Sequence, residues 1–262
     1  MPKAAVNGIE IYYETQGEGD PLMLLTGLGG AGKGWGPQVP IFSKAFFTIV
    51  PDHRGAGQST FAEDGYTIEQ HASDMADMLR SLDCGPAHIV GSSTGGAIAT
   101  VMALDHPDVV RTIVVCSSWA RTDAFFRREF EVRKQTLRDS GIEAYQQANA
   151  LFLFAPTYVR DHDDDVRQWC EMVTAIPADV DVMIKRIDMI IAHDQLDRLG
   201  GIRKPTLVIV GEEDFCTPPY FSKELAEAIP EAELTILKGG HFFYKERPEA
   251  FHQRVREFVK KH

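Results

Sequence analysis

The sequence predicts an α/β fold, with a mostly parallel central sheet flanked by helices and a helical segment inserted in the second half of the chain. Short apolar runs alternate with helix-like stretches, an order that is typical of α/β proteins. This alternation stops over residues 119–201, where only helix-like segments occur. A chain of 262 residues is long enough for one large core with an inserted subdomain. We therefore expect a core of residues 1–118 and 202–262, and a helical lid of residues 119–201.

The first strands are expected to form a hairpin. Residues 9–14 alternate roughly between apolar and polar, and the turn-forming cluster of residues 17–21 follows them. Later apolar runs suit strands that are buried on both faces of a parallel sheet. These runs are residues 22–25, 47–50, 87–90, 112–116, 206–210 and 233–237. Helices are expected between them at residues 68–82, 96–104 and 222–228.

The composition excludes several classes of protein. A formal net charge of −11 does not favour binding to a nucleic-acid backbone. The four cysteines form no CxxC pair, which indicates free thiols in a reducing compartment. The N-terminus lacks the apolar stretch of a secretory signal, and no run approaches the length of a membrane span. We expect a cytoplasmic protein with neither a nucleic-acid nor a membrane partner.

Two local patterns in the expected lid favour structural roles. Val180, Ile184, Ile187 and Ile191 lie at helical spacing and form one apolar stripe, which is typical of packing. The acidic run at residues 161–165 lacks the glycine and the final glutamate of a calcium loop, so we interpret it as a solvated turn. No metal site is expected.

The glycine-rich residues 27–32 fit two nucleotide-binding patterns only in part. They match GxGxxG, with Asp52 at the distance of a ribose-binding acid, and they nearly match a phosphate loop in which Gly34 replaces the required hydroxyl residue. Both patterns need a helix to begin at this point, but two glycines and two prolines over residues 34–40 disfavour one. A dinucleotide-binding oxidoreductase is therefore a low-ranked alternative, and a loop that approaches a reacting centre is favoured.

A candidate nucleophile lies in the sequence Gly91-Ser92-Ser93-Thr94-Gly95. This GxSxG pattern follows an expected strand and precedes an expected helix, which is the context that gives the pattern its meaning. Small residues flank the serine because the turn is strained and crowded. We interpret Ser93 as the nucleophile, with the backbone amide of Thr94 available beside it at the helix start.

The partners of Ser93 are sought on loops that follow other strands. His241 follows Gly239-Gly240 after the last expected strand, and it is the preferred general base; His193 is the rival. Asp214 follows the strand at residues 206–210 and precedes a proline-rich loop, so it is the preferred acid, with Asp123 as the less favoured alternative.

A second backbone amide is needed to hold the charge that develops on a carbonyl oxygen. Leu28 lies in the glycine loop after the first buried strand and is the expected source of that amide.

With these motifs the chain resembles the α/β-hydrolase fold superfamily. Leu24-Leu25-Thr26-Gly27-Leu28-Gly29-Gly30 is similar to its oxyanion loop, and Asp52-His53-Arg54-Gly55-Ala56-Gly57-Gln58-Ser59 is similar to its D-x-R-G-x-G-x-S turn. The similarity runs from Ile9 to Phe258 in the expected order, and Ser93, Asp214 and His241 follow the order of the family's triad. One departure is Thr26, because the family usually has a histidine there that braces the oxyanion loop.

The resemblance implies a serine hydrolase that cleaves a small carboxylic ester through an acyl-enzyme, without a metal or a cofactor. Small bacterial carboxylesterases, enol-lactone hydrolases and aminoacrylate hydrolases are the most similar members. Hydrolysis of a lactone, an aminoacrylate or amide, or a carbon–carbon bond remains an alternative, and a non-catalytic small-molecule receptor ranks lower.

The expected acyl pocket is apolar, and its candidate lining residues are Trp119, Phe152, Phe154 and Phe242. If the substrate is an anion, Arg54 or Arg121 is the candidate partner for it.

Overall fold

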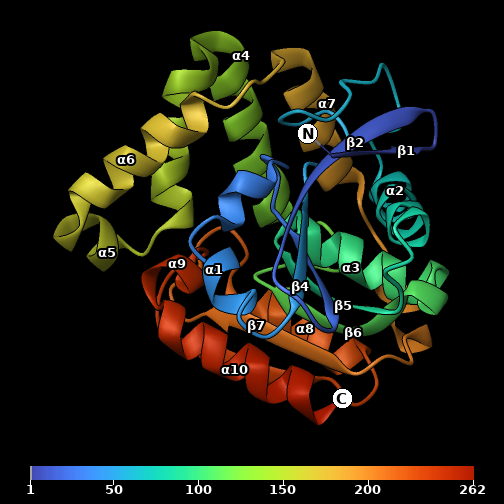
Figure 1. The fold of residues 1–262 in the computed structure, drawn as a ribbon. Helices are drawn as coiled ribbons and strands as arrows, with labels where there is room; N and C mark the ends of the chain where they lie inside the picture. Colours follow the sequence, from blue (N-terminus) through green and yellow to red (C-terminus); the bar gives the residue numbers. More distant parts are fainter. Residues whose placement is uncertain (1) are drawn as a thin grey trace.

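The computed structural model describes residues 2–262 and contains a central eight-stranded sheet (Figure 1). The strand order is β1-β2-β4-β3-β5-β6-β7-β8. Strands β3 to β8 pair in parallel, whereas β1 and β2 run antiparallel at one edge. The strands are β1 (Lys3–Val6), β2 (Ile9–Gln16), β3 (Pro21–Leu25), β4 (Phe47–Pro51), β5 (Ala87–Ser92), β6 (Val110–Cys116), β7 (Thr206–Gly211) and β8 (Glu233–Leu237).

The first hairpin turns earlier than the sequence predicts. It joins β1 to β2 through Asn7 and Gly8, both with positive φ angles (47° and 75°), as a two-residue hairpin turn requires. The expected turn at residues 17–21 instead connects β2 to β3, and β4 lies between those two strands. Glycine is needed there as well: Gly17 has a φ angle of 86°, and a Cβ atom on it would lie 2.3 Å from the carbonyl oxygen of Ser43.

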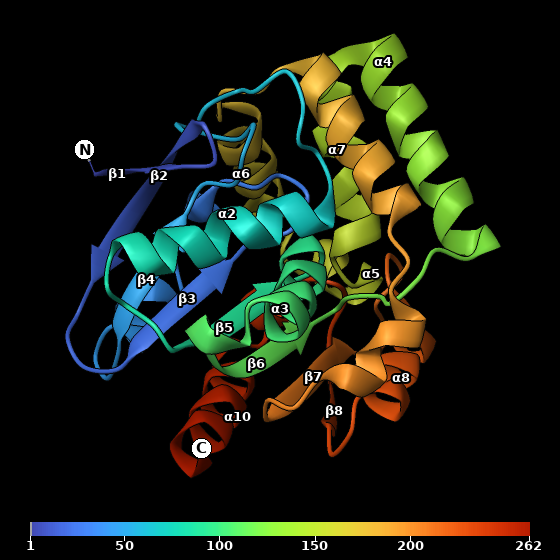
Figure 2. The ribbon, with the colours of Figure 1, turned by 90° about the vertical axis from the view of Figure 1, so that its right-hand side faces the viewer.

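Helices cover both faces of the sheet (Figure 2). One face packs against α2 (Ile68–Ser81), α3 (Thr94–Asp105) and α8 (Pro219–Ala228). The other packs against α1 (Val39–Phe42), α9 (Phe243–Glu246) and α10 (Pro248–Lys261). Alternate residues of the central strands enter the two cores, which is the pattern of a parallel sheet covered on both sides.

Strand β8 differs from the expectation of burial on both faces. Its side chains alternate in exposure, and Leu234 and Ile236 are 38% and 46% exposed. The reason is its place at the edge of the sheet, where only β7 pairs with it.

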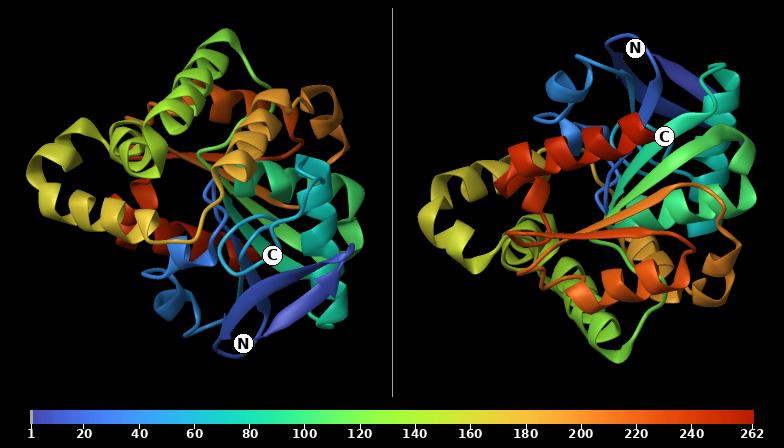
Figure 3. Two further views of the ribbon diagram at one scale, coloured as in Figure 1. Left: turned by 90° about the horizontal axis from the view of Figure 1, so that it is seen from above. Right: turned by 90° about the horizontal axis from the view of Figure 1, so that it is seen from below.

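Residues 119–201 contain helices and no strand, and we call them the helical insertion. Its elements are α4 (Ala124–Leu153), α5 (Pro156–Asp161), α6 (Asp163–Thr174), α7 (Val180–Ala192) and the 3-10 helix η3 (Leu196–Gly201). Helix α4 is kinked at Gly141, whose φ angle is 79°. Helices α4 and α7 lie above the sheet, whereas α5 and α6 extend beyond its edge (Figure 3). Along the stripe on α7, Ile187 and Ile191 are buried, but Val180 at the helix start is exposed.

The acidic run forms helix ends rather than a turn. Asp161 ends α5, and Asp163, Asp164 and Asp165 make up the first turn of α6. Carboxylates are stabilising at that end of a helix because the amide dipoles point toward them. No helix within residues 2–262 is long and apolar enough to cross a membrane.

The parallel strands bring six connections to one edge of the sheet. The segments after β3, β4, β5, β6, β7 and β8 all leave from the carboxyl ends of their strands. In open α/β sheets this edge is where ligands bind. The segment after β6 is the helical insertion, so the same edge is also covered.

Six of the nine histidines are buried, and burial lowers the pKa of five of them. The five are His53, His71, His88, His193 and His252. His193 is a simple case: burial lowers its pKa to about 4, and its ring packs against Trp119. In the unfolded chain a histidine takes up its proton near pH 6.5. Stability that depends on neutral His193 is therefore complete above pH 6.5 and is lost as the pH falls toward 4.

We predict that His193→Gln makes stability less dependent on pH. The free energy of unfolding of the wild type should fall more steeply between pH 6.5 and 4 than that of the variant, by up to one proton, or about 1.4 kcal/mol per pH unit. Chemical denaturation at several pH values measures both slopes. Equal slopes would mean that His193 is not a neutral buried group in the folded protein.

Candidate active site

Ser93 occupies a strained turn between β5 and α3. Its φ and ψ angles are 54° and −117°, which is unusual for a residue with a side chain. Its backbone amide donates to the carbonyl of Cys116 at 2.8 Å, and its carbonyl accepts from Ser118 Oγ at 2.9 Å. The flanking glycines are required by space: a Cβ atom would lie 2.1 Å from the Gly95 oxygen at Gly91, and 2.3 Å from the Leu25 oxygen at Gly95.

A buried carboxylate orients the imidazole of His241. The Nδ1 atom lies 3.0 Å from each carboxylate oxygen of Asp214. Thr217 holds that carboxylate, with its amide 2.9 Å from Oδ1 and its hydroxyl 3.0 Å from Oδ2. Both members of the pair are almost fully buried. A proton held on Nδ1 by the carboxylate leaves Nε2 as the basic nitrogen.

A glutamate that the sequence did not single out fixes the loop that carries His241. Glu246 Oε1 accepts hydrogen bonds from the amide of Gly240 at 3.2 Å and from the amide of Ala155 at 2.9 Å. Ala155 lies between α4 and α5, so this carboxylate ties the histidine loop to the helical insertion. Burial raises the pKa of Glu246, whereas the two backbone donors favour its charged form.

Ser93 and His241 line one cavity of about 130 Å³. Leu28 lines it too, from a tight turn in which the Gly30 amide donates to the Gly27 carbonyl at 2.9 Å. Thr94 is the first residue of α3, and the first amides of a helix have no partner within the helix. The structure therefore brings the five residues named from the motifs to the same edge of the sheet.

The rival assignments take other roles. His193 is buried against Trp119 and does not line the cavity. Asp123 caps α4, where its carboxylate accepts from the Phe126 amide at 2.8 Å and from the Tyr220 hydroxyl at 2.6 Å.

Three of the four expected pocket aromatics were assigned wrongly. Trp119 is fully buried in the core against Phe126. Phe152 packs near Phe215, and Phe154 stacks on Tyr158; neither lines the cavity. Only Phe242 of the four does. The sequence gives the position of each ring along the chain, but the direction in which the ring faces depends on tertiary packing.

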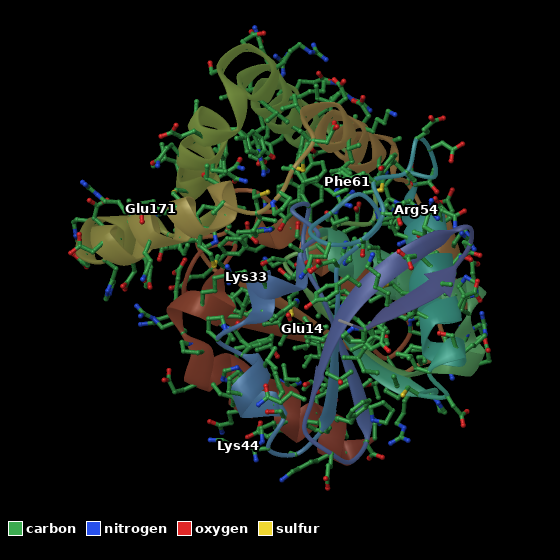
Figure 4. All side chains as sticks on the ribbon, turned by 45° about the horizontal axis from the view of Figure 1, so that its top comes forward. Glu14, Lys33, Lys44, Arg54, Phe61 and Glu171 are labelled. Carbon is green, nitrogen blue, oxygen red and sulfur yellow. The ribbon has the colours of Figure 1, made fainter. Side chains whose placement is uncertain are left out.

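The two arginines expected to attract an anion lie elsewhere. Arg54 forms a buried bidentate ion pair with Asp74 of α2, at 2.8 and 2.9 Å, on the α2 side of the molecule (Figure 4). Arg121 is exposed and pairs with Glu224. Neither side chain lines the cavity.

Arg133 of α4 is the buried arginine that does line the cavity. Its Nη1 donates to Glu129 at 3.0 Å and its Nε to Asn149 at 2.9 Å. Its Nη2 donates to no protein atom within residues 2–262, and the buried Tyr145 hydroxyl beside it likewise has no partner in that range. Only the helical spacing of Glu129 and Arg133 could have indicated this pair in the sequence.

The glycine segment does not provide a nucleotide site. Asp52 accepts from the amides of Gly32 at 2.7 Å and Gln58 at 2.8 Å, so its carboxylate organises two turns. The segment continues as a four-residue 3-10 helix, η1 (Gly32–Trp35). Among residues 2–262 no group of three histidine, cysteine or acidic side chains could hold a metal ion.

Comparison with known proteins agrees with this architecture. The family model for the alpha/beta hydrolase fold matches residues 20–248. A protein of Azorhizobium caulinodans named "Putative carbamate hydrolase RutD" is 36% identical over 98% of both chains. The enol-lactonase of Burkholderia xenovorans LB400 is 29% identical, with a TM-score of 0.91 over 99% of this chain and 100% of that one. Est816, described as an N-acyl homoserine lactone degrading enzyme, is 30% identical with a TM-score of 0.86, over 98% and 100%.

Proposed function

The chain belongs to the α/β-hydrolase fold family, and from this premise we propose that it is a serine hydrolase that cleaves small carboxylic esters through an acyl-enzyme intermediate. One observation carries the proposal. The Asp214 carboxylate lies 3.0 Å from His241 Nδ1, and this imidazole lines the same small cavity as the strained Ser93. A hydroxyl, an imidazole and a buried carboxylate at one site are the groups that nucleophilic catalysis by serine requires.

In the proposed reaction, His241 Nε2 takes the Ser93 proton as Oγ attacks the carbonyl carbon. The oxygen of the tetrahedral intermediate takes up the negative charge, and the amides of Leu28 and Thr94 donate to it. The intermediate collapses to an acyl-Ser93 ester, and the leaving alcohol receives the proton from His241. Water then attacks that ester with His241 again as base, which releases the acid and restores Ser93.

The cavity limits the size of the acyl group. A volume of about 130 Å³ is close to that of an apolar cavity that holds benzene. Much of its wall is apolar, with side chains from both the core and the helical insertion, among them Leu28, Phe130, Leu153, Met183 and Phe242. Short acyl groups fit such a space, whereas long lipid chains do not.

Carbamate hydrolysis on the same residues is a second candidate. The unpartnered Tyr145 hydroxyl can accept a hydrogen bond from the N–H of a carbamate, a group that a simple ester lacks, and the unpartnered Arg133 Nη2 can donate to an oxygen of the same substrate. The name of the relative from Azorhizobium caulinodans supports the same class of substrate. A carbamate bears a nitrogen in place of the first acyl carbon of an ester, so an acceptor for its N–H would favour it over an alkyl ester.

We predict that Ser93→Ala remains folded and loses nearly all hydrolysis of 4-nitrophenyl acetate. The reason is the loss of the only atom that forms the acyl bond in the proposed reaction. Circular dichroism and the unfolding midpoint check the fold. Ser92→Ala is the matched control, since its hydroxyl donates to Tyr244 at 3.2 Å rather than facing the cavity. Retained activity in Ser93→Ala together with its loss in Ser92→Ala would reassign the nucleophile.

We predict that Asp214→Asn lowers kcat by roughly 10³–10⁴-fold and changes KM much less. The amide cannot stabilise the imidazolium that forms in the transition state, and it favours the wrong tautomer of His241. Steady-state kinetics over a range of pH measures the effect. Asp123→Asn is the matched control, because it makes the same change at a carboxylate that caps α4 and does not line the cavity. It should leave kcat near the wild-type value.

We predict that kcat/KM for straight-chain 4-nitrophenyl esters rises over the first few acyl carbons and then falls. Each buried methylene stabilises binding by about 0.8 kcal/mol, or roughly fourfold, until the cavity is full. A small aryl carbamate tested beside the ester series separates the two candidate functions. A flat profile, or one that climbs steadily to long chains, would contradict a cavity that limits the acyl group to this size.

A further inference from the structure

Arg186 is a fully buried cation on α7 of the helical insertion. Its Nε and Nη2 atoms both donate to the carbonyl of Leu28, at 3.0 and 2.8 Å. Its Nη1 atom donates to the carbonyl of Arg54 at 2.6 Å and lies 3.3 Å from His71 Nε2. The guanidinium therefore connects two loops that follow β3 and β4.

This guanidinium has no carboxylate partner within residues 2–262, although it is desolvated. Burial lowers its pKa to about 10, so it keeps its charge at neutral pH. A buried charge without a counter-ion is unfavourable unless it is well hydrogen-bonded. Here backbone carbonyls of the loops supply that compensation, and the arginine and the loops hold one another in place.

The loop is built to receive the guanidinium. A Cβ atom on Gly30 would lie 2.4 Å from Arg186 Nη2, so only glycine leaves room for it. The Gly30 carbonyl also accepts from the His53 amide at 2.8 Å, which joins the two loops a second time. Thr26, at the position where a histidine brace is expected, has a buried hydroxyl without a partner in the described chain.

We propose that Arg186 is a positioning residue that holds the Leu28 turn in the geometry needed to stabilise the oxyanion, in place of a brace at Thr26. The inference rests on the proposed acyl transfer at Ser93. Clamping the Leu28 carbonyl limits rotation of that residue, which lines the cavity, and so fixes the direction in which its amide points. Because Arg186 belongs to α7, the insertion takes part in forming the oxyanion hole as well as in covering the site.

Arg186→Met tests the proposal with 4-nitrophenyl acetate as the probe. Loss of one oxyanion donor lowers kcat by roughly 10²–10³-fold, and we expect a fall in kcat of that order with little change in KM. Arg186→Lys should retain only part of the wild-type kcat, since an ammonium group cannot reproduce the paired hydrogen bonds of a planar guanidinium. In Arg186→Ala, millimolar guanidinium chloride should raise kcat about tenfold or more, because the ion can occupy the vacant position.

Ile187→Ala is the matched control. Ile187 is the next residue on α7 and is fully buried, so its truncation leaves a cavity that weakens the packing of the insertion. The change removes none of the hydrogen bonds to the Leu28 carbonyl. An equal loss of kcat in Ile187→Ala, with no rescue of Arg186→Ala by guanidinium, would show that Arg186 only secures the insertion. A kcat near the wild-type value in folded Arg186→Met would also overturn the proposal.

Hydrogen exchange separates failure of this inference from failure of the proposed function. The amides of residues 26–34 should exchange faster in Arg186→Met than in Ile187→Ala, whether or not an ester is turned over. If the wild type hydrolyses no ester or carbamate but these amides exchange faster in Arg186→Met, the proposed acyl transfer is wrong, whereas the proposed role of Arg186 in holding the loop is supported. Unchanged exchange in Arg186→Met would refute the clamp itself.

Discussion

The close approach of two backbone turns is the constraint on which the candidate site depends. The turn at Ser93 and the loop after β3 meet where Gly95 faces the Leu25 carbonyl and Gly27 faces the Ser93 Cβ, and a Cβ atom would lie 2.3 Å and 3.2 Å from those atoms. No other residue type fits at Gly95 without moving the backbone. This contact sets the distance between the nucleophile and the amide expected to stabilise the oxyanion, and the neighbouring strands β3 and β5 maintain it.

The acid–base pair is held by a separate set of buried polar contacts. Thr217 fixes the Asp214 carboxylate, and Glu246 fixes the loop that carries His241. Each carboxylate accepts from backbone amides, and for Glu246 these donors favour the charged form against the effect of burial. Glu246 also reaches the insertion through the Ala155 amide, so the orientation of the imidazole depends on both parts of the chain.

The helical insertion supplies buried polar side chains that surround Ser93, Asp214 and His241. It contributes Arg133 and Tyr145 to the cavity wall, and Arg186 to the Leu28 turn. These side chains come from α4 and α7, two helices that pack on each other above the carboxyl edge of the sheet. In the proposed function, the packing of these two helices therefore links substrate recognition to the geometry of the oxyanion hole.

The sequence by itself predicted the α/β sheet, seven of its eight strands, and the places of Ser93, Asp214 and His241 after β5, β7 and β8, because local pattern and glycine spacing encode strand–turn–helix units. It failed at the β8 edge and at the first hairpin, where neighbours in space decide burial and pairing. It also failed in the insertion, where Trp119 entered the core and Arg133 and Arg186 became the buried arginines at the site. Only the tertiary structure could decide these, since the direction in which a helix faces depends on contacts with residues distant in the chain.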